Sequence, residues 1–202
     1  METEEIREKK EPKRLPVWAC ILLFALGLFV CMGLYGTIGF GLLSLILGDE
    51  ARHPGLLVYT VTEANMLLSV LTPAVILLYF ERRPFSDLGL TLKGHVRGLW
   101  YGLLVAMLLY LIGFGLSLAI GEVEVTGFQF DPLNLLGTFV FCLLVALTEE
   151  IMMRGYILGR LLHTRMNKFL ALFVSALLFA LLHIFNPNVA FLPMLNLVIA
   201  GM

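Results

Sequence analysis

The sequence has little charge and few of the features that characterise soluble or disulfide-rich proteins. Only 14% of its 202 residues are charged and 59% are hydrophobic, whereas roughly a quarter of a soluble globular chain is charged. The net charge of -1 gives no electrostatic case for binding nucleic acid, whose partners carry basic patches, so we expect no nucleic-acid partner. The three cysteines form no CxxC pair, which argues against a disulfide scaffold or a cysteine zinc site. The sequence also lacks a glycine-rich phosphate loop and an internal repeat.

Long apolar runs make up most of the chain. A helix needs about 20 apolar residues to cross the hydrocarbon layer, and five stretches come close to or exceed this length. They are 15–47, 55–80, 98–120, 133–159 and 169–185, followed by an incomplete run at 189–202. The sequence therefore predicts an all-α, polytopic integral membrane helical bundle with five spans plus an incomplete sixth. We divide it into a charged cytoplasmic tail (1–14), N-terminal transmembrane helices (15–132) and a C-terminal membrane core (133–202).

Basic residues alternate from loop to loop. The tail carries five, the 81–97 loop four and the 160–168 loop three, whereas the 48–54 loop carries only Arg52 and the 121–132 loop none. Cytoplasmic loops are enriched in Lys and Arg, so we expect the N-terminus on the cytoplasmic side. The expected location is the plasma membrane of a prokaryote.

Ionisable residues inside the apolar runs indicate where chemistry takes place. Each costs at least about 2.5–3.5 kcal/mol on insertion scales, so each needs an explanation. In the fourth run Glu150 precedes Arg154 by four residues, which is the favourable order for an ion pair within a helix. Glu149 lies about 100° around the helix from Glu150. Glu149 is therefore predicted to be the unpaired carboxylate.

His183 in the fifth run is predicted to meet Glu149. Glu149 is 11 residues from Arg160, and His183 is 15 residues from Lys168. At about 1.5 Å per residue, they lie roughly 17 and 22 Å from the cytoplasmic boundary. The two spans are joined by a short polar link, so we expect them to be neighbours. A carboxylate and an imidazole are both ligands that zinc accepts.

Other polar residues receive no catalytic role. Glu63, in the second run, either faces a polar cavity or hydrogen-bonds within the bundle near Asn65. The remaining histidines lie in loops and are expected to be solvated: His53, His95 and His163. The three cysteines are interpreted as small buried hydrophobic residues: Cys20, Cys31 and Cys142.

Two motifs resemble those of a known family. Glu-Glu-x-x-x-Arg at 149–154 and Phe-x-x-x-His at 179–183 are similar to motifs of the CAAX-processing and bacteriocin-processing intramembrane metalloproteases, also called the CAAX protease self-immunity or Abi family. The segment 196–201 resembles the start of that family's next helix, so the similarity covers roughly residues 133–202.

The resemblance implies a function and roles for the residues of the core. It implies a metal-dependent intramembrane endopeptidase that cleaves a membrane-associated or lipidated peptide, prenylated in one branch of the family. Glu149 would activate a metal-bound water, and Glu150 and Arg154 would orient the site. His183, with Glu149 beside it, would bind the metal, which is expected to be zinc.

The sequence departs from the family pattern at its end. The family normally continues through a further helix that carries a second histidine and an asparagine, and the sequence stops at Met202 before such a motif. The 14 residues of 189–202 make about 21 Å of helix, which is short of the membrane thickness of about 30 Å. We therefore expect either a fragment of a longer protein or a truncated member with an incomplete zinc site.

Two other functions stay open at this point. A non-catalytic membrane scaffold or immunity protein would keep the helical bundle without a complete site. A transporter would use Glu149, Glu150 and His183 as a proton relay, a common use of intramembrane ionisable residues. Binding of zinc distinguishes the protease from the scaffold, and proton-coupled uptake into liposomes would indicate the transporter.

Overall fold

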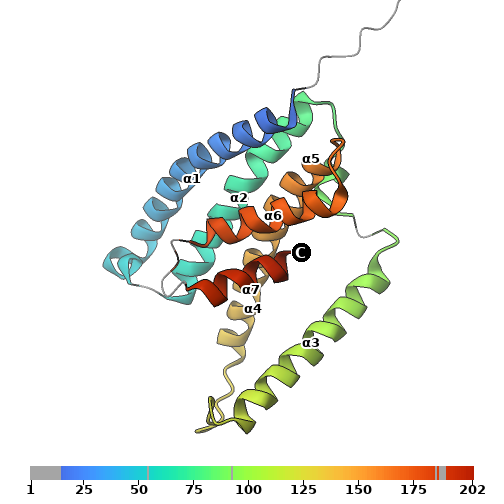
Figure 1. Cartoon of the computed structure of the whole chain (residues 1–202). Helices are drawn as coiled ribbons and strands as arrows, with labels where there is room; N and C mark the ends of the chain where they lie inside the picture. Colours follow the sequence, from blue (N-terminus) through green and yellow to red (C-terminus); the bar gives the residue numbers. More distant parts are fainter. Residues whose placement is uncertain (1–14, 54, 92, 185, 187–189) are drawn as a thin grey trace, which may run out of the picture.

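The computed structural model describes residues 15–53, 55–91, 93–184, 186 and 190–202, and it is helical with no strand in these ranges. The predicted charged tail, 1–14, lies outside the described residues. Two short segments, Gly48–Arg52 (η1) and Phe85–Leu88 (η2), are 3₁₀-helices, and Ile151–Leu158 (η3) is a π-helix. The elements in chain order (Figure 1) are α1 Val17–Leu47, η1 Gly48–Arg52, α2 Leu56–Phe80, η2 Phe85–Leu88, α3 Val96–Ala119, α4 Pro132–Glu150, η3 Ile151–Leu158, α5 Gly159–Leu162, α6 Lys168–Leu182 and α7 Phe191–Gly201.

Four helices in the described part of the chain are long and apolar enough to cross a membrane. They are Val17–Leu47, Leu56–Phe80, Val96–Ala119 and the continuous helix Pro132–Leu162, which joins α4, η3 and α5. The apolar helices α6 and α7 are shorter, with 15 and 11 residues. The prediction of an all-α, polytopic membrane bundle is confirmed. The fifth predicted span appears as α6, which is shorter than the length of about 20 residues that a full crossing requires.

Helices α1 and α2 pack closely because glycines on α1 leave room for side chains of α2. A Cβ at Gly27 would stand 2.8 Å from Cβ of Pro73, and one at Gly39 would stand 1.8 Å from Nδ2 of Asn65. Small residues bring backbones together in this way in membranes, where no hydrophobic driving force between helices exists. The first predicted apolar run, 15–47, forms one unbroken helix of 31 residues, α1.

The start of α4 is fixed by its own sequence. The Asp131 carboxylate accepts hydrogen bonds from the backbone N–H groups of Leu133 and Asn134, each at 3.1 Å. Pro132 occupies the first turn, where its missing N–H costs nothing. An acidic N-cap followed by proline is a strong helix start, so α4 leaves the 121–132 loop at a defined residue.

The π-helix η3 forms the centre of the buried core. Six of its eight residues are buried, and they contact buried residues of α1 and α2. The ring of Tyr156 stacks on Phe24 of α1 with centroids 4.3 Å apart. At Gly155 a Cβ would stand 2.6 Å from the Leu88 carbonyl oxygen of η2. The turn after α2 therefore packs directly on η3, next to the predicted site residue Arg154.

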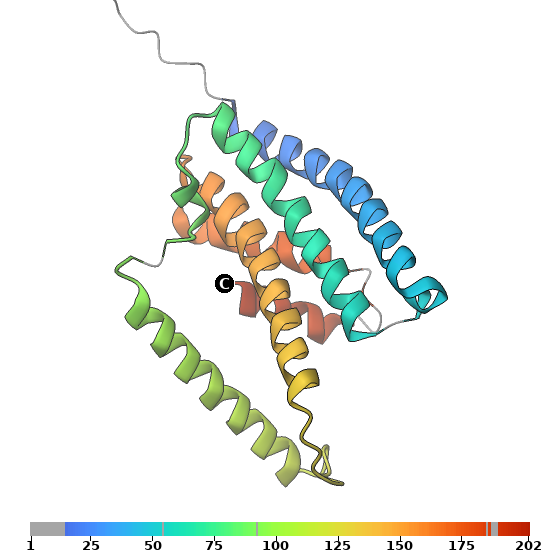
Figure 2. The same cartoon turned by 180° about the vertical axis from the view of Figure 1, so that it is seen from behind.

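Helix α3 stands apart from the other helices in both views (Figures 1 and 2). None of its residues is buried, and its mean hydropathy is 2.2 over the most apolar window. A helix that is apolar on all sides is suited to lipid. The remaining helices form the bundle that carries the candidate site: α4 runs beside α2, and α6 and α7 pack on each other.

Candidate active site

Glu149 and His183 meet between the last turn of α4 and the end of α6. His183 Nε2 lies 3.5 Å from Glu149 Oε1. The Glu149 side chain is 36% exposed and that of His183 is 22% exposed, so both are accessible from one side and partly covered by the bundle. This contact agrees with the expectation that a carboxylate and an imidazole from these two spans converge.

The orientation of the His183 ring is fixed by its own helix. Nδ1 donates a hydrogen bond to the Phe179 carbonyl oxygen at 2.9 Å, and the two rings pack edge to face with centroids 4.6 Å apart. This bond holds the Nδ1 side of the ring against its own helix. The other ring nitrogen, Nε2, faces Glu149. The Phe-x-x-x-His spacing thus aims one ring nitrogen at the carboxylate.

Glu150 and Arg154 form the ion pair that the sequence predicts. Arg154 Nη1 donates to Glu150 Oε1, and Arg154 Nη2 donates to the Ala200 carbonyl oxygen of α7 at 3.3 Å. The guanidinium therefore connects the helix formed by α4, η3 and α5 to α7. The positive charge of Arg154 is paired with the Glu150 carboxylate, whereas the Glu149 carboxylate contacts His183.

A small cavity lies beside these groups. It is about 20 Å³ in volume and is lined by side chains from three helices, which is enough room for one water molecule. The lining residues are Glu149, Glu150, Met153, Arg154, Ser175, Ala176, Phe179 and Gly201. A water in this place has the carboxylates and the guanidinium as polar neighbours.

The part of the chain that holds this cavity also matches a known family. Residues 131–202 match the family model of type II CAAX prenyl endopeptidase Rce1-like proteins. The resemblance predicted from the sequence is confirmed for this segment, which we call the CAAX endopeptidase-like segment. It begins at the N-cap of α4 and includes all four predicted site residues: Glu149, Glu150, Arg154 and His183. No curated protein and no solved structure matches the chain.

The donor atoms in the CAAX endopeptidase-like segment fit two positions of a zinc site. Ligand nitrogen and oxygen atoms lie about 2.0–2.2 Å from zinc in a tetrahedral site, so two of them stand roughly 3.4 Å apart, close to the observed 3.5 Å between Glu149 and His183. The described residues contain no group of three or more His, Cys, Asp or Glu side chains placed to hold a metal. Glu149 and His183 would thus account for two of the three protein ligands that a catalytic zinc usually has.

The other polar candidates lie elsewhere. Glu63 and Asn65 line a separate cavity of about 390 Å³ between α1 and α2, so Glu63 does not join the site. His53, His95 and His163 are exposed, as the sequence predicts. The cysteine interpretation is wrong in part. Only Cys20 is buried, whereas Cys31 is half-buried and Cys142 is exposed.

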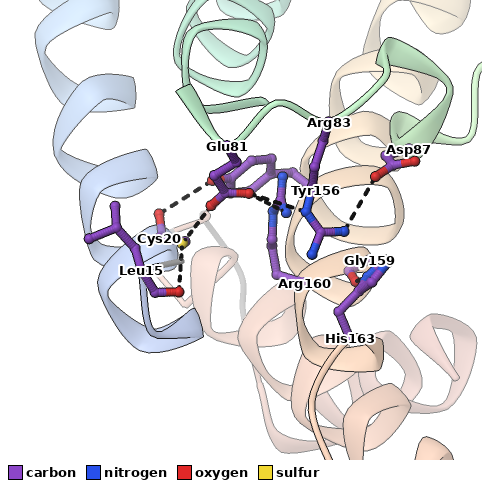
Figure 3. A network of polar contacts seen from close by, with 9 residues as sticks. All are labelled: Leu15, Cys20, Glu81, Arg83, Asp87, Tyr156, Gly159, Arg160 and His163. Carbon is purple, nitrogen blue, oxygen red and sulfur yellow. Dashed lines mark hydrogen bonds and ion pairs between the residues drawn. The ribbon is translucent and has the colours of Figure 1, made fainter. Parts of the chain in front are cut away.

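A polar network holds the α5 end of the helix formed by α4, η3 and α5 (Figure 3). The carboxylate of Glu81, at the end of α2, pairs with Arg160 of α5 at 2.5 Å and with Arg83 at 3.4 Å. The Cys20 thiol of α1 donates to the same carboxylate at 2.7 Å. The Arg160 guanidinium lies 5.0 Å from the centre of the Tyr156 ring, a distance typical of cation–π contacts. Three helices are therefore joined at one carboxylate.

The network changes the interpretation of Arg160. The sequence places this residue in a cytoplasmic loop, but the helix continues to Leu162 and the Arg160 side chain is only 5% exposed. A buried charge must be paired, and Glu81, which lies 79 positions earlier in the sequence, is its partner. The spacing of residues within one helix cannot predict this ion pair, because its two partners lie in different helices.

Proposed function

We propose that the chain is a metal-dependent intramembrane endopeptidase that cleaves a membrane-associated or lipidated peptide. The observation that carries the proposal is the 3.5 Å contact between Glu149 and His183 in adjacent helices of a membrane bundle. The match of residues 131–202 to an endopeptidase family supports the same activity. We propose that the N-terminus lies on the cytoplasmic side of a plasma membrane, because the basic loops alternate as the positive-inside rule requires.

Glu149 is proposed as the general base. Its carboxylate is not neutralised by Arg154, which pairs with Glu150, and it borders a cavity with room for one water. A carboxylate within reach of that water takes its proton as the oxygen attacks the peptide carbonyl carbon. The same group then gives the proton to the departing amine, so that it ends the cycle ionised again.

His183 and Glu149 are the residues that would hold zinc. The chemistry that zinc supplies when bound is polarisation of the substrate carbonyl and a lowered pKa of the attacking water. His183 contributes through the fixed direction of Nε2, because the Phe179 carbonyl oxygen holds the opposite side of the ring. A partner on the second ring nitrogen of this kind is a common feature of histidines that bind metals.

Glu150 and Arg154 are proposed to orient the site. The ion pair neutralises both charges inside the bundle, and the bond from Arg154 to the Ala200 carbonyl oxygen fixes α7 against the catalytic helix. Removing the arginine would leave Glu150 as an unpaired carboxylate one residue from the base.

A comparison of two histidines tests the proposal. His183 and His163 each donate from Nδ1 to the carbonyl oxygen four residues earlier, but only His183 faces Glu149. In lipid vesicles, His183→Ala is expected to lower kcat/KM by at least about 100-fold, since even the loss of an outer partner of a metal ligand costs 10–100-fold. His163→Ala is expected to cleave like the wild type.

The assay uses quenched fluorescent peptides, with and without a lipidated C-terminal cysteine. Faster cleavage of the lipidated series supports a membrane-associated substrate, and equal cleavage of both series contradicts this part of the proposal. Equal activities of the two histidine variants would contradict the assignment of His183. Binding without any cleavage would favour a non-catalytic membrane scaffold.

A further inference from the structure

Ser175 of α6 donates a hydrogen bond to the backbone of another helix. Another hydroxyl contact between helices in the described residues joins Tyr35 of α1 to Thr72 of α2, but it pairs two side chains and not a side chain with a backbone. The Ser175 Oγ donates to the Met153 carbonyl oxygen of η3 at 3.2 Å, and both residues are buried. Six other Ser and Thr hydroxyls donate instead to the carbonyl oxygen four residues earlier in their own helix: Thr37, Ser44, Thr60, Thr62, Ser69 and Thr148. This intrahelical bond is the usual choice of a helical hydroxyl, so the bond of Ser175 is a contact between helices.

The bond lies on the face of α6 that carries the site. Ser175, Phe179 and His183 are spaced four residues apart, and residues at this spacing share one side of a helix. On the other helix, Met153 lies four residues after Glu149, and both border the same small cavity. Two contacts thus connect the same pair of helices: His183 with Glu149, and Ser175 with the Met153 backbone.

The bond also ends in the π-helix, where the backbone departs from regular α geometry. Met153 is the third residue of η3, directly before Arg154. Both Ser175 and Met153 border the 20 Å³ cavity beside Glu149. Because the serine side chain is short, its donation to a backbone oxygen holds the backbones of α6 and η3 close together at this point.

We propose that Ser175 is a positioning residue, whose bond to the Met153 carbonyl oxygen sets His183 against Glu149. The inference rests on the proposed function, because its effect is read in the activity of those two residues. A shift of about 1 Å in a catalytic group lowers the rate by about 100-fold. Loss of the hydroxyl leaves the fold in place, since the buried neighbours of Ser175 still pack, and frees α6 to slide or turn on η3.

Three variants of the full chain in lipid vesicles test the proposal. Ser175→Ala removes the contact between helices, Ser175→Thr keeps the hydroxyl, and Ser69→Ala removes an equally buried hydroxyl whose bond stays within α2. We expect Ser175→Ala to lower kcat by about 10- to 100-fold with little change in KM. Ser175→Thr is expected to restore most of the rate, and Ser69→Ala to match the wild type in kcat. Zinc affinity is measured in parallel, and is expected to fall in Ser175→Ala alone.

Failure of this inference is distinguishable from failure of the proposed function. If Glu149→Gln is inactive while Ser175→Ala and Ser69→Ala have equal kcat and zinc affinity, Ser175 is not a positioning residue. A loss of thermal stability without loss of kcat per folded molecule also contradicts the proposal. If Glu149→Gln cleaves as fast as the wild type, the proposed function is wrong, and the inference about Ser175 falls with it.

Discussion

Replacing Glu149 by Gln is expected to lower kcat by about 10²- to 10⁴-fold, the usual contribution of a general base. The substitution keeps the size and shape of the side chain, so helix α4 and its contact with α6 are retained. It removes the ability to accept a proton, because an amide oxygen is a very weak base. Initial cleavage rates in lipid vesicles at saturating peptide give kcat directly.

The matched control for this prediction is Glu63→Gln. Glu63 is also a carboxylate in a membrane-spanning helix, but it lines the separate cavity between α1 and α2. Its substitution is expected to leave kcat within about twofold of the wild type, as is typical of a change outside the reacting groups. A Glu149→Gln variant that is as active as Glu63→Gln would remove Glu149 from the mechanism.

Replacing Arg160 by Ala is expected to destabilise the protein by about 3–5 kcal/mol, the cost of breaking a buried ion pair from one side. The side chains of Arg160 and Glu81 are 5% and 9% exposed, so removal of the arginine leaves a buried carboxylate with one weaker partner, Arg83. Because the Cys20 thiol donates to the same carboxylate, α1 is expected to loosen together with α2. Unfolding in detergent micelles titrated with a denaturing detergent measures the change.

A double variant separates the ion pair from simple packing. Replacing Glu81 by Leu and Arg160 by Met together leaves no unpaired charge, and such replacements of buried pairs are often neutral or stabilising. The double variant is therefore expected to be more stable than either single variant. If the two single losses simply add in the double variant, the residues do not act as a pair.

The parts of the fold that follow from local sequence were predictable. The helix boundaries lie within a few residues of the predicted runs, because apolar length and cap residues such as Asp131 act locally. The ion pair of Glu150 with Arg154 follows from helical spacing alone. The meeting of Glu149 with His183 required one more assumption, that two helices joined by a short link lie side by side, and this assumption holds here.

The remaining features depend on contacts between distant segments. The π-helix at Ile151–Leu158 has no distinct sequence pattern, and it packs against α2, α6 and η2, which are distant from it in the sequence or follow it along the chain. The partners of Arg160 and Cys20 come together through the tertiary fold at Glu81. Ser175 carried a readable signal, since it lies eight residues before His183 on the same face of α6, but the carbonyl oxygen it binds belongs to another helix.

The most direct test of the central claim is the amount of zinc bound per chain, measured by equilibrium titration of metal-free protein in lipid vesicles. The claim is that Glu149 and His183 act on one metal. Wild type is expected to bind one zinc ion, and Glu149→Ala and His183→Ala are each expected to bind it at least about 10-fold more weakly, as loss of a metal-site group requires. His163→Ala serves as the control with unchanged affinity. Zinc bound equally well by all four proteins, or by none of them, would contradict the account.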